Sequence, residues 1–529
     1  MLPISHDTCD VLELARRLPV ALRRRSRLAH SGGRSAQDRD NARQGEAGPL
    51  GARKRRALPA WSGLALLVAG AFFMENLDGT IIATAAPRMA RSFGVPSVEL
   101  NIVITAYLLA LGVFIPVSGW IADRFGARLV FSGALAVFTV SSGLCALSVN
   151  LGELTVARVL QGMGGAMMVP VGRLVVLRAA SKADIIRVVA YLTWPGLVAP
   201  VVAPALGGAL VTYASWRWIF VLNLPLGLIA LLVAVRIVPK LRPGRPAGLD
   251  WQGFALTGAG LGAFVYGLEL VTDGNVSWAF IGAAIGAGTI LLWWAVSHLR
   301  NSAHPLLDLD VLRVPTFRAA SLGGSFFRMA ISAAPFLLAL MFQNGFGWNP
   351  LRSGLLVLAV FAGNIAIKPF TTLILHRFGF RTVIMTSAAA VGLTLGLCAS
   401  LTAGTPLVLI VVVLVVSGVF RSIGFTAYNT IVFADVEPEG MGNANTLSST
   451  IQQLSVGLGV AVGALALRAG VPLDHLVGAA STGVGPFDAA FLLLAAVALL
   501  AGAEAMLLAP QAGSAISVAR PDGDPGTLL

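Results

Sequence analysis

Two carboxylates and one arginine lie inside long apolar runs, where a charged side chain is costly and therefore a candidate for function. Glu75 and Asp78 are three residues apart in the run 61–86, and Arg158 lies in the first half of the run 151–177. If these runs are helices, Glu75 and Asp78 share nearly one face. Two carboxylates that close in a low dielectric cannot both stay charged cheaply, so we expect at least one to bind a proton near neutral pH.

The same residues also have a purely structural interpretation. Asp78 could make a structural hydrogen bond or anchor a helix kink, and Glu75 could do the same. Arg158 keeps its positive charge, so it needs a carboxylate or carbonyl partner within the membrane, and that pairing could be structural alone. The pattern indicates proton coupling but leaves these alternatives open.

The composition indicates a protein with many membrane-spanning helices. The chain has 529 residues, a mean hydropathy of +0.80, 56% hydrophobic residues and only 12% charged residues. Soluble domains carry about twice that charged fraction, so an ordinary soluble protein is excluded. The three cysteines are single and far apart, which suggests neither a disulfide framework nor a thiolate metal site.

The net charge of +13 does not indicate nucleic-acid binding, because the basic residues lie in connecting turns and in the N-terminal tail. Residues 1–60 hold 13 Lys and Arg against 6 Asp and Glu. We interpret this tail as disordered and cytoplasmic, with the cluster 53–56 at anionic headgroups. A cleavable organellar presequence and an upstream extension outside the working protein are the alternatives.

Windows of roughly 20 apolar residues predict about fourteen spans and an all-α polytopic membrane fold. Two of the predicted spans cover residues 100–122 and 353–375. The predicted order is an N-terminal six-helix bundle (61–238), linker loops with two inserted transmembrane helices (239–316), a C-terminal six-helix bundle (317–508) and a cytoplasmic C-terminal tail (509–529).

A charged turn between two apolar runs occurs twice. Arg124, Phe125, Gly126 and Arg128 return at an offset of 253 residues, as Arg377, Phe378, Gly379 and Arg381. A six-helix bundle occupies less than this offset, and the remainder matches the two inserted spans. We therefore predict that each half repeats the other, an organisation that many transporters use for alternating access.

Lys and Arg in short loops predict the orientation of these spans. If the N-terminal tail is cytoplasmic, most loop cations fall on the cytoplasmic side and few on the other. An even number of spans then places both termini in the cytoplasm.

Four motifs carry a resemblance to a known family. Residues 119–131 resemble the loop signature between the second and third helices of the major facilitator superfamily, and the extra central pair of spans resembles its fourteen-helix drug:proton antiporter branch. Residues 77–87, 158–166 and 199–208 resemble that branch's first-helix, fourth-helix and fifth-helix antiporter motifs. Ala83 stands where Asn is usual, and Ala199 and Ala203 stand where glycines are typical. Within the branch, the chain is similar to bacterial multidrug exporters of the MdtD and HsrA type.

This resemblance implies roles for particular residues. Asp78 would carry the proton together with Glu75, which the family motif does not include and which is a candidate because of its mid-span position alone. The family-level role carried over to Arg158 is to tune the release of the proton. A conformational latch would comprise Gly119, Asp123, Arg124, Gly126 and Arg128. In the second copy of the latch, Thr372 replaces Gly119 and His376 replaces Asp123. A hinge that seals the cavity would comprise Pro200, Pro204, Gly207 and Gly208. A solvated turn and a plain packing motif are the respective alternatives.

The substrate wall is predicted to include Tyr107, Gln161, Met163, Trp194, Phe336, Gln343 and Asn344. Aromatic and Met side chains accommodate varied apolar shapes, although such residues often face lipid or only pack. The sequence has no Walker loop, no His-Glu metal pair and no motif that would activate a catalytic nucleophile. We therefore expect no enzyme activity, no cofactor and no metal.

The resemblance implies a proton-coupled antiporter that exports drug-like or amphiphilic compounds across the cytoplasmic (inner) membrane of a bacterium. Its expected partners are a small-molecule substrate, protons and the lipid bilayer, with a periplasmic or outer-membrane adaptor as a further candidate. Nucleic acid is not expected, and we expect a monomer. An exporter or uniporter of one specific metabolite is one alternative, and a non-transporting membrane receptor or scaffold is another.

Overall fold

The computed structural model describes residues 60–240, 248–271, 276–477 and 485–513. The described residues belong to one compact unit, residues 59–529. Residues 1–59 of the predicted N-terminal tail lie outside them, as do residues 514–529 of the predicted C-terminal tail. Within the described ranges every regular element is a helix, as the long apolar runs predict.

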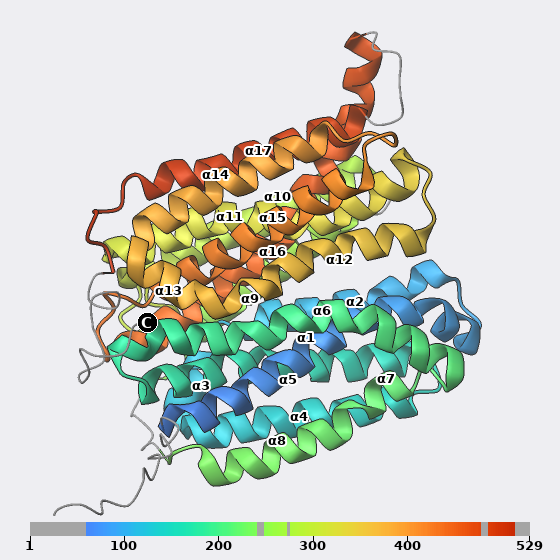
Figure 1. Cartoon of the computed structure of the whole chain (residues 1–529). Helices are drawn as coiled ribbons and strands as arrows, with labels where there is room; N and C mark the ends of the chain where they lie inside the picture. The colour runs from blue at the N-terminus through green and yellow to red at the C-terminus, as the bar shows by residue number, and fades with distance from the viewer. Residues whose placement is uncertain (1–59, 241–247, 272–275, 478–484, 514–529) are drawn as a thin grey trace, which may run out of the picture. The chain divides into compact units, whose positions relative to one another are not determined.

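The first bundle consists of helices that cross the unit in alternating directions (Figure 1). Helix α1 packs mainly against α6 and α5, and α4 packs between α5 and α8. The helices are α1 (Ala60–Phe93), α2 (Asn101–Phe114), α3 (Ser118–Phe125), α4 (Ala127–Leu147), α5 (Leu151–Ala179), α6 (Ile185–Tyr213), α7 (Trp218–Val221) and α8 (Asn223–Ile237).

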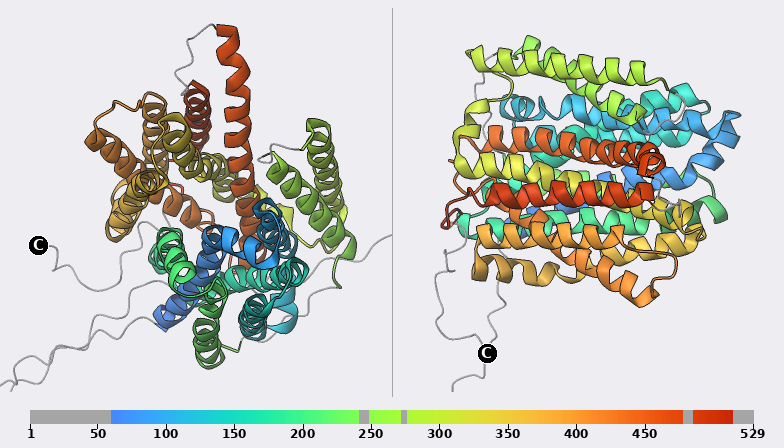
Figure 2. Two further views of the ribbon diagram at one scale, coloured as in Figure 1. Left: turned by 90° about the vertical axis from the view of Figure 1, so that its right-hand side faces the viewer. Right: turned by 90° about the horizontal axis from the view of Figure 1, so that it is seen from above.

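Two inserted helices, α9 (Trp251–Leu270) and α10 (Trp278–Asn301), pack against each other as a pair (Figure 2). Helix α9 also contacts α2 of the first bundle and α16 (Met441–Val477) of the second, so it lies where the two bundles meet. Asp250 caps the start of α9 by accepting a hydrogen bond from the Gly253 N–H at 2.7 Å. Its carboxylate also meets Nε2 of His298, at the end of α10, at 2.8 Å.

The second bundle repeats the packing of the first. Helix α11 packs against α16 and α17, and α14 packs between α15 and α17. The helices are α11 (Pro315–Leu340), α12 (Pro350–Ala366), α13 (Lys368–Phe378), α14 (Phe380–Ala399), α15 (Leu407–Ile431), α16 and α17 (Gly485–Ala505). A short π-helix (Met341–Gly345) continues α11.

Two predicted spans are broken, which corrects the expectation of single helices over 100–122 and 353–375. Helix α2 meets α3 at a bend of 58°, and the segment Arg352–Ala366 of α12 meets α13 at a bend of 54°. Pro116 lies in the first break, and Pro369 lies at the start of α13. Proline lacks the N–H and clashes with the preceding turn, so a helix kinks or ends there. Among the described residues, twelve helices can cross a membrane, or up to fourteen spans if each bent pair is one.

The repeat is visible in the backbone at the turn that follows each bent pair. Gly126 joins α3 to α4 with φ 87°, and Gly379 joins α13 to α14 with φ 73°. Both values lie in the left-handed region that favours glycine, so each turn requires this residue. The offset of 253 residues in the sequence therefore corresponds to a repeated structural unit.

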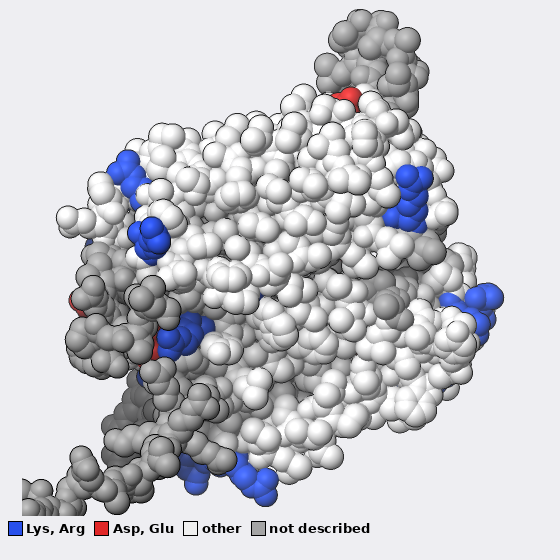
Figure 3. Space-filling view, viewed as in Figure 1, with Lys and Arg blue, Asp and Glu red and all other residues white. Residues whose placement is uncertain are grey.

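Charged residues gather at the two ends of the helices and leave an apolar flank between them (Figure 3). We call the end at which α1 begins the basic end. Arg124, Arg178 and Arg377 lie there, at the ends of α3, α5 and α13. Large apolar side chains such as Leu66 and Trp293 are exposed between the ends. An uncharged flank of this kind suits contact with lipid.

Candidate functional site

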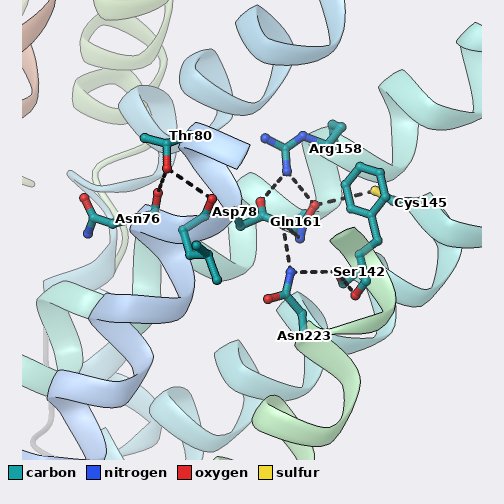
Figure 4. Close-up of polar contacts among 10 residues, drawn as sticks. Asn76, Asp78, Thr80, Ser142, Cys145, Arg158, Gln161 and Asn223 are labelled. Carbon is teal, nitrogen blue, oxygen red and sulfur yellow. Dashed lines mark hydrogen bonds and ion pairs between the residues drawn. The ribbon is translucent and has the colours of Figure 1, made fainter. Parts of the chain in front are cut away.

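A buried ion pair joins α1 to α5 in the first bundle. Asp78 and Arg158 are 1% and 0% exposed, and Nη1 of Arg158 contacts Oδ2 of Asp78 directly (Figure 4). Because α1 and α5 are antiparallel, residue 78, just past the middle of α1, meets residue 158 in the first third of α5. Arg158 thus has the carboxylate partner that its position in the sequence requires.

Amide side chains complete the coordination of the Asp78 carboxylate. Oδ1 of Asp78 accepts a hydrogen bond from Nε2 of Gln161 at 3.0 Å and another from Nδ2 of Asn223, in α8, at 2.9 Å. Gln161 also accepts from Nη1 of Arg158 at 2.8 Å, and Asn223 also donates to Ser142 of α4 at 3.0 Å. The carboxylate therefore connects α1, α5 and α8 directly and α4 through Asn223, and a change in its charge would act on this network.

Glu75 and Tyr107 lie beside this network. Oε2 of Glu75 and Oη of Tyr107 are buried and make no hydrogen bond among the described residues. A Cβ on Gly165 would lie 3.5 Å from the Tyr107 hydroxyl and 3.7 Å from the Glu75 carboxyl carbon, so both groups approach the same point of α5. The Arg158 guanidinium lies 4.0 Å from the centre of the Tyr107 ring. Tyr107 thus touches the ion pair on one side and lies near Glu75 on the other.

A small cavity lies between the two bundles, nearer the basic end. Arg173 of α5 lines it on one side, and Asn429 of α15 lines it on the other. The other lining residues are Val68, Phe72, Val169, Val189, Leu192, Thr193, Phe425 and Gln452. Its free volume is about 40 Å³, enough for a water molecule or a small ion. Arg173 also interacts electrostatically with Glu75, which links the cavity to the carboxylates of α1.

The family model described as Major Facilitator Superfamily matches residues 68–460 and 320–524. The chain belongs to the major facilitator superfamily. It is therefore a transporter of small molecules rather than an enzyme, and its spans make it a multi-pass protein of the inner membrane.

Members of this superfamily with similar sequences are found in enteric bacteria. MdtD of Salmonella paratyphi A, which carries the name multidrug resistance protein, is 36% identical over 407 residues, covering 76% of this chain and 85% of that protein. MdtD of Cronobacter sakazakii is also 36% identical, over 406 residues, with the same coverage. The predicted resemblance to the MdtD type is thereby confirmed.

Solved structures of the superfamily share the fold at low sequence identity. The human organic anion transporter MFSD10 has a TM-score of 0.58 at 14% identity and covers 84% of this chain and 97% of its own. The proton:xylose symporter XylE, bound to a deoxyglucose derivative, has a TM-score of 0.56 at 12% identity and covers 83% of this chain and 94% of its own. At these identities the likeness establishes the fold alone.

Residues 119–131, the predicted loop signature, lie against the second bundle. Asp123 is 3.5 Å from Nη2 of Arg178, and its Oδ2 would be 3.7 Å from a Cβ on Gly442, at the start of α16. A carboxylate at a helix N-terminus interacts favourably with the helix dipole. A Cβ on Gly119 would collide with Thr446 of α16, so the close approach depends on glycine there. Gly126 makes the turn described above; Arg124 is exposed and Arg128 half-buried.

The residues of the predicted hinge lie within α6, which is assigned as one helix. A Cβ on Gly207 would collide with Thr84 and Ile81 of α1, whereas one on Gly208 would meet nothing within 4 Å. Gly207 therefore allows the close packing of α6 on α1. Pro200 lies in the same helix, and the side chain of Pro204 is outside the described residues.

The predicted substrate-wall residues do not come together around the cavity. Tyr107 and Gln161 are buried in the ion-pair network instead. Trp194 and Phe336 are 46% and 36% exposed. Met163 and Gln343 are half-buried, and Asn344 is exposed. None of the seven lines the cavity.

Sequence reasoning gave no role to two residues that the structure places in or beside this site. Asn223 binds Asp78 directly, and Arg173 lines the cavity and interacts with Glu75. Both are polar residues within or beside apolar runs, which was the available signal. Their partners could not be identified from the sequence, because helix rotation decides which face each presents.

Proposed function

We propose that this chain is a proton-coupled antiporter that exports drug-like or amphiphilic small molecules across the cytoplasmic membrane. The observation that carries the proposal is the buried Asp78–Arg158 pair, with a second carboxylate, Glu75, one helical turn away. In this proposal Asp78, together with Glu75, carries the proton, and Arg158 modulates its release. Intramembrane ionisable groups of this kind commonly form proton relays in transporters.

The geometry suggests how a proton at Asp78 would act on the helices. Protonation removes the charge that Arg158 needs, and a guanidinium without its carboxylate is costly in a buried site. The amide groups of Gln161 and Asn223, which donate to Oδ1, would lose a charged acceptor at the same time. Because these residues belong to α5 and α8, the proton would bias how the helices of the first bundle pack.

The direction of transport is inferred from orientation and from relatives. The excess of Lys and Arg at the basic end favours a cytoplasmic location for that end and for both termini. The similarity to proteins named for multidrug resistance supports export of drug-like compounds.

The two bundles are joined near the basic end. Asn445 of α16 donates to the Pro170 carbonyl of α5 at 2.8 Å, and Lys368 of α13 donates to Thr193 of α6 at 3.3 Å. With the proposed orientation, these contacts would close the cytoplasmic end of the molecule. The latch around Asp123 would then hold that closed state.

Asp78→Asn in proteoliposomes tests the proposal. With an imposed proton gradient, the wild type is expected to accumulate a drug-like substrate against its gradient, and Asp78→Asn is expected to lose this accumulation. Exchange of labelled for unlabelled substrate, which needs no net proton movement, provides a second readout of the same preparation. Asp310→Asn is a matched control, because Asp310 is an exposed carboxylate outside the network.

Three outcomes would contradict parts of the proposal. Undiminished accumulation by Asp78→Asn would exclude proton antiport through Asp78. Wild-type transport that is indifferent to the proton gradient would favour a uniporter. An absence of any transport by the wild type across a broad panel of compounds would favour the receptor or scaffold interpretation.

A further inference from the structure

Three cations are buried in the spans of the second bundle. Arg328 of α11, Lys368 of α13 and Arg421 of α15 are 5%, 6% and 8% exposed. Arg328 donates to Asn429 at 3.1 Å, and Lys368 donates to Thr426 at 2.8 Å. Nε and Nη1 of Arg421 and Nε of Arg328 have no hydrogen-bond partner among the described residues. None of the three forms a salt bridge within the described part of the chain.

This arrangement differs from the first bundle, where the buried Arg158 and the half-buried Arg173 each have an acid nearby. Arg158 is paired with Asp78, and Arg173 interacts with Glu75. A buried charge without a counter-charge is expensive, and intramembrane cations are seldom kept without a functional reason. An anion that binds during transport and then leaves would provide the missing counter-charge.

The internal repeat relates positions of the second bundle to the acid and the cation of the first. Gly162 of α5 packs on the Tyr107 carbonyl of α2, and Gly418 of α15 packs on the Val360 carbonyl of α12. These two contacts correspond at offsets of 256 residues between α5 and α15, and 253 residues between α2 and α12.

The same offsets pair two further sets of positions. If the offset of 253 found for α2 and α12 is extended to α1 and α11, it relates Glu75 to Arg328; the offset of 256 relates Arg173 to Asn429. In the first bundle the pair is an acid and a cation, whereas in the second it is a cation and a neutral amide. The four repeat-related positions therefore hold two cations and one acid.

Two of these four positions, Arg173 and Asn429, line the cavity between the bundles. Arg173 and Asn429 line it from opposite sides, and Arg328 is bonded to Asn429. Thr193, which accepts from Lys368, lines it too. Arg328 is therefore one hydrogen bond away from the cavity that Arg173 lines. A cavity lined by one cation, with two more cations bonded to its lining residues, favours a ligand of the opposite charge.

We propose that the exported compound is an amphiphilic organic anion whose carboxylate, sulfonate or phosphate group binds between Arg173 and Arg328. Planar guanidinium groups match such anions through paired hydrogen bonds. The apolar part of the compound would extend along Phe72 and Phe425, which also line the cavity. The present volume admits only the charged group, so the apolar part requires the bundles to move apart. This inference rests on the proposed export function and specifies its substrate class.

A matched set of dyes tests the substrate class in proteoliposomes. Fluorescein is anionic, rhodamine 123 is cationic, and both share the xanthene ring system, so their main difference is charge. We expect the wild type to transport fluorescein at least tenfold faster than rhodamine 123. An imposed potential that is negative on the basic-end side should accelerate fluorescein export, because an anion leaving and a proton entering move charge in the same direction.

Variants locate the site. Arg173→Gln and Arg328→Gln should each reduce the ratio of fluorescein to rhodamine 123 transport rates at least tenfold. Arg328→Lys should retain a measurable preference for fluorescein because it keeps the charge. Arg352→Gln is the matched control, since Arg352 is exposed at the start of α12 and stacks on Trp348 outside the cavity. Thermal unfolding of each purified variant would separate loss of folding from loss of recognition.

The outcomes distinguish this inference from the proposed function. Faster transport of rhodamine 123 than of fluorescein, or an unchanged preference in a folded Arg328→Gln, would overturn the anion site while leaving proton-coupled export intact. Absence of transport of both dyes and of every other drug-like compound would overturn the export function and the anion site together.

Discussion

Removing Asp78 should destabilise the protein more than removing its partner Arg158. Asp78→Asn leaves a guanidinium that is 0% exposed and has no carboxylate partner, beside the Gln161 carbonyl oxygen and the Tyr107 ring. Arginine does not lose its proton, so the charge remains buried. Removing one partner of a buried ion pair costs about 3–5 kcal/mol. Arg158→Gln should cost less, because a carboxyl group left alone can become neutral by binding a proton.

A double-mutant cycle measures the pair directly. The double variant Asp78→Asn with Arg158→Gln leaves no buried charge, so it should be more stable than Asp78→Asn alone. We expect the sum of the losses in free energy of unfolding of the two single variants to exceed the loss of the double variant by on the order of 3 kcal/mol. The assay is thermal unfolding of the purified proteins in one detergent, with Tm as the readout. Asp310→Asn again serves as a control for changing a carboxylate to an amide.

The result that would refute this reasoning is additivity. If the double variant unfolds at the temperature that the two single shifts predict by addition, Asp78 and Arg158 do not stabilise each other. A Tm of Asp78→Asn equal to or above that of Arg158→Gln would contradict the argument that the arginine is the costlier group to leave unpaired.

Three further predictions concern other parts of the molecule. Asp123→Asn should slow transport more than His376→Asn, by about two- to fivefold, because a carboxylate at a helix N-terminus contributes ~0.3–1 kcal/mol; equal rates would contradict the latch. Gly164→Ala should lower the free energy of unfolding by about 1–3 kcal/mol, because its Cβ would lie 2.8 Å from the Phe138 backbone nitrogen. Gly133→Ala is the control: its Cβ would meet nothing within 4 Å, so it should leave Tm unchanged or raise it.

The last of the three concerns Asp250, which lies just before α9. Burial opposes ionisation, but the Gly253 N–H, His298 and the Leu306 N–H together hold the pKa of this carboxyl below its ordinary value. A carboxyl group with a lowered pKa stabilises the folded protein at pH values above the ordinary pKa of a carboxyl group. That stabilisation is lost as the pH falls through the lowered pKa. Asp250→Ala should therefore lower Tm at pH 7 by more than Asp250→Asn, which can still cap the helix, and the Tm difference between wild type and Asp250→Ala should shrink in acid.

The sequence by itself determined the fold class, the repeat and the ionisable candidates. Apolar runs of span length leave few alternatives to helices in a membrane, because each backbone polar group must be satisfied within its own segment. The recurrence of Arg124-Phe125-Gly126 as Arg377-Phe378-Gly379 needed only the printed residues. Asp78 and Arg158 stood out because charges are rare in such runs.

Only the tertiary structure decided which of these residues meet. The rotation of α5 about its axis sends Arg158 to Asp78 and Arg173 toward the cavity, and hydropathy carries no information on that rotation. The same limit explains the predicted substrate wall, since Tyr107 and Gln161 have suitable side chains but face the ion pair. The excess of buried cations in the second bundle became apparent only when burial and missing partners could be assessed together. Residue type identified what could be charged in the membrane, and packing decided which charges are paired.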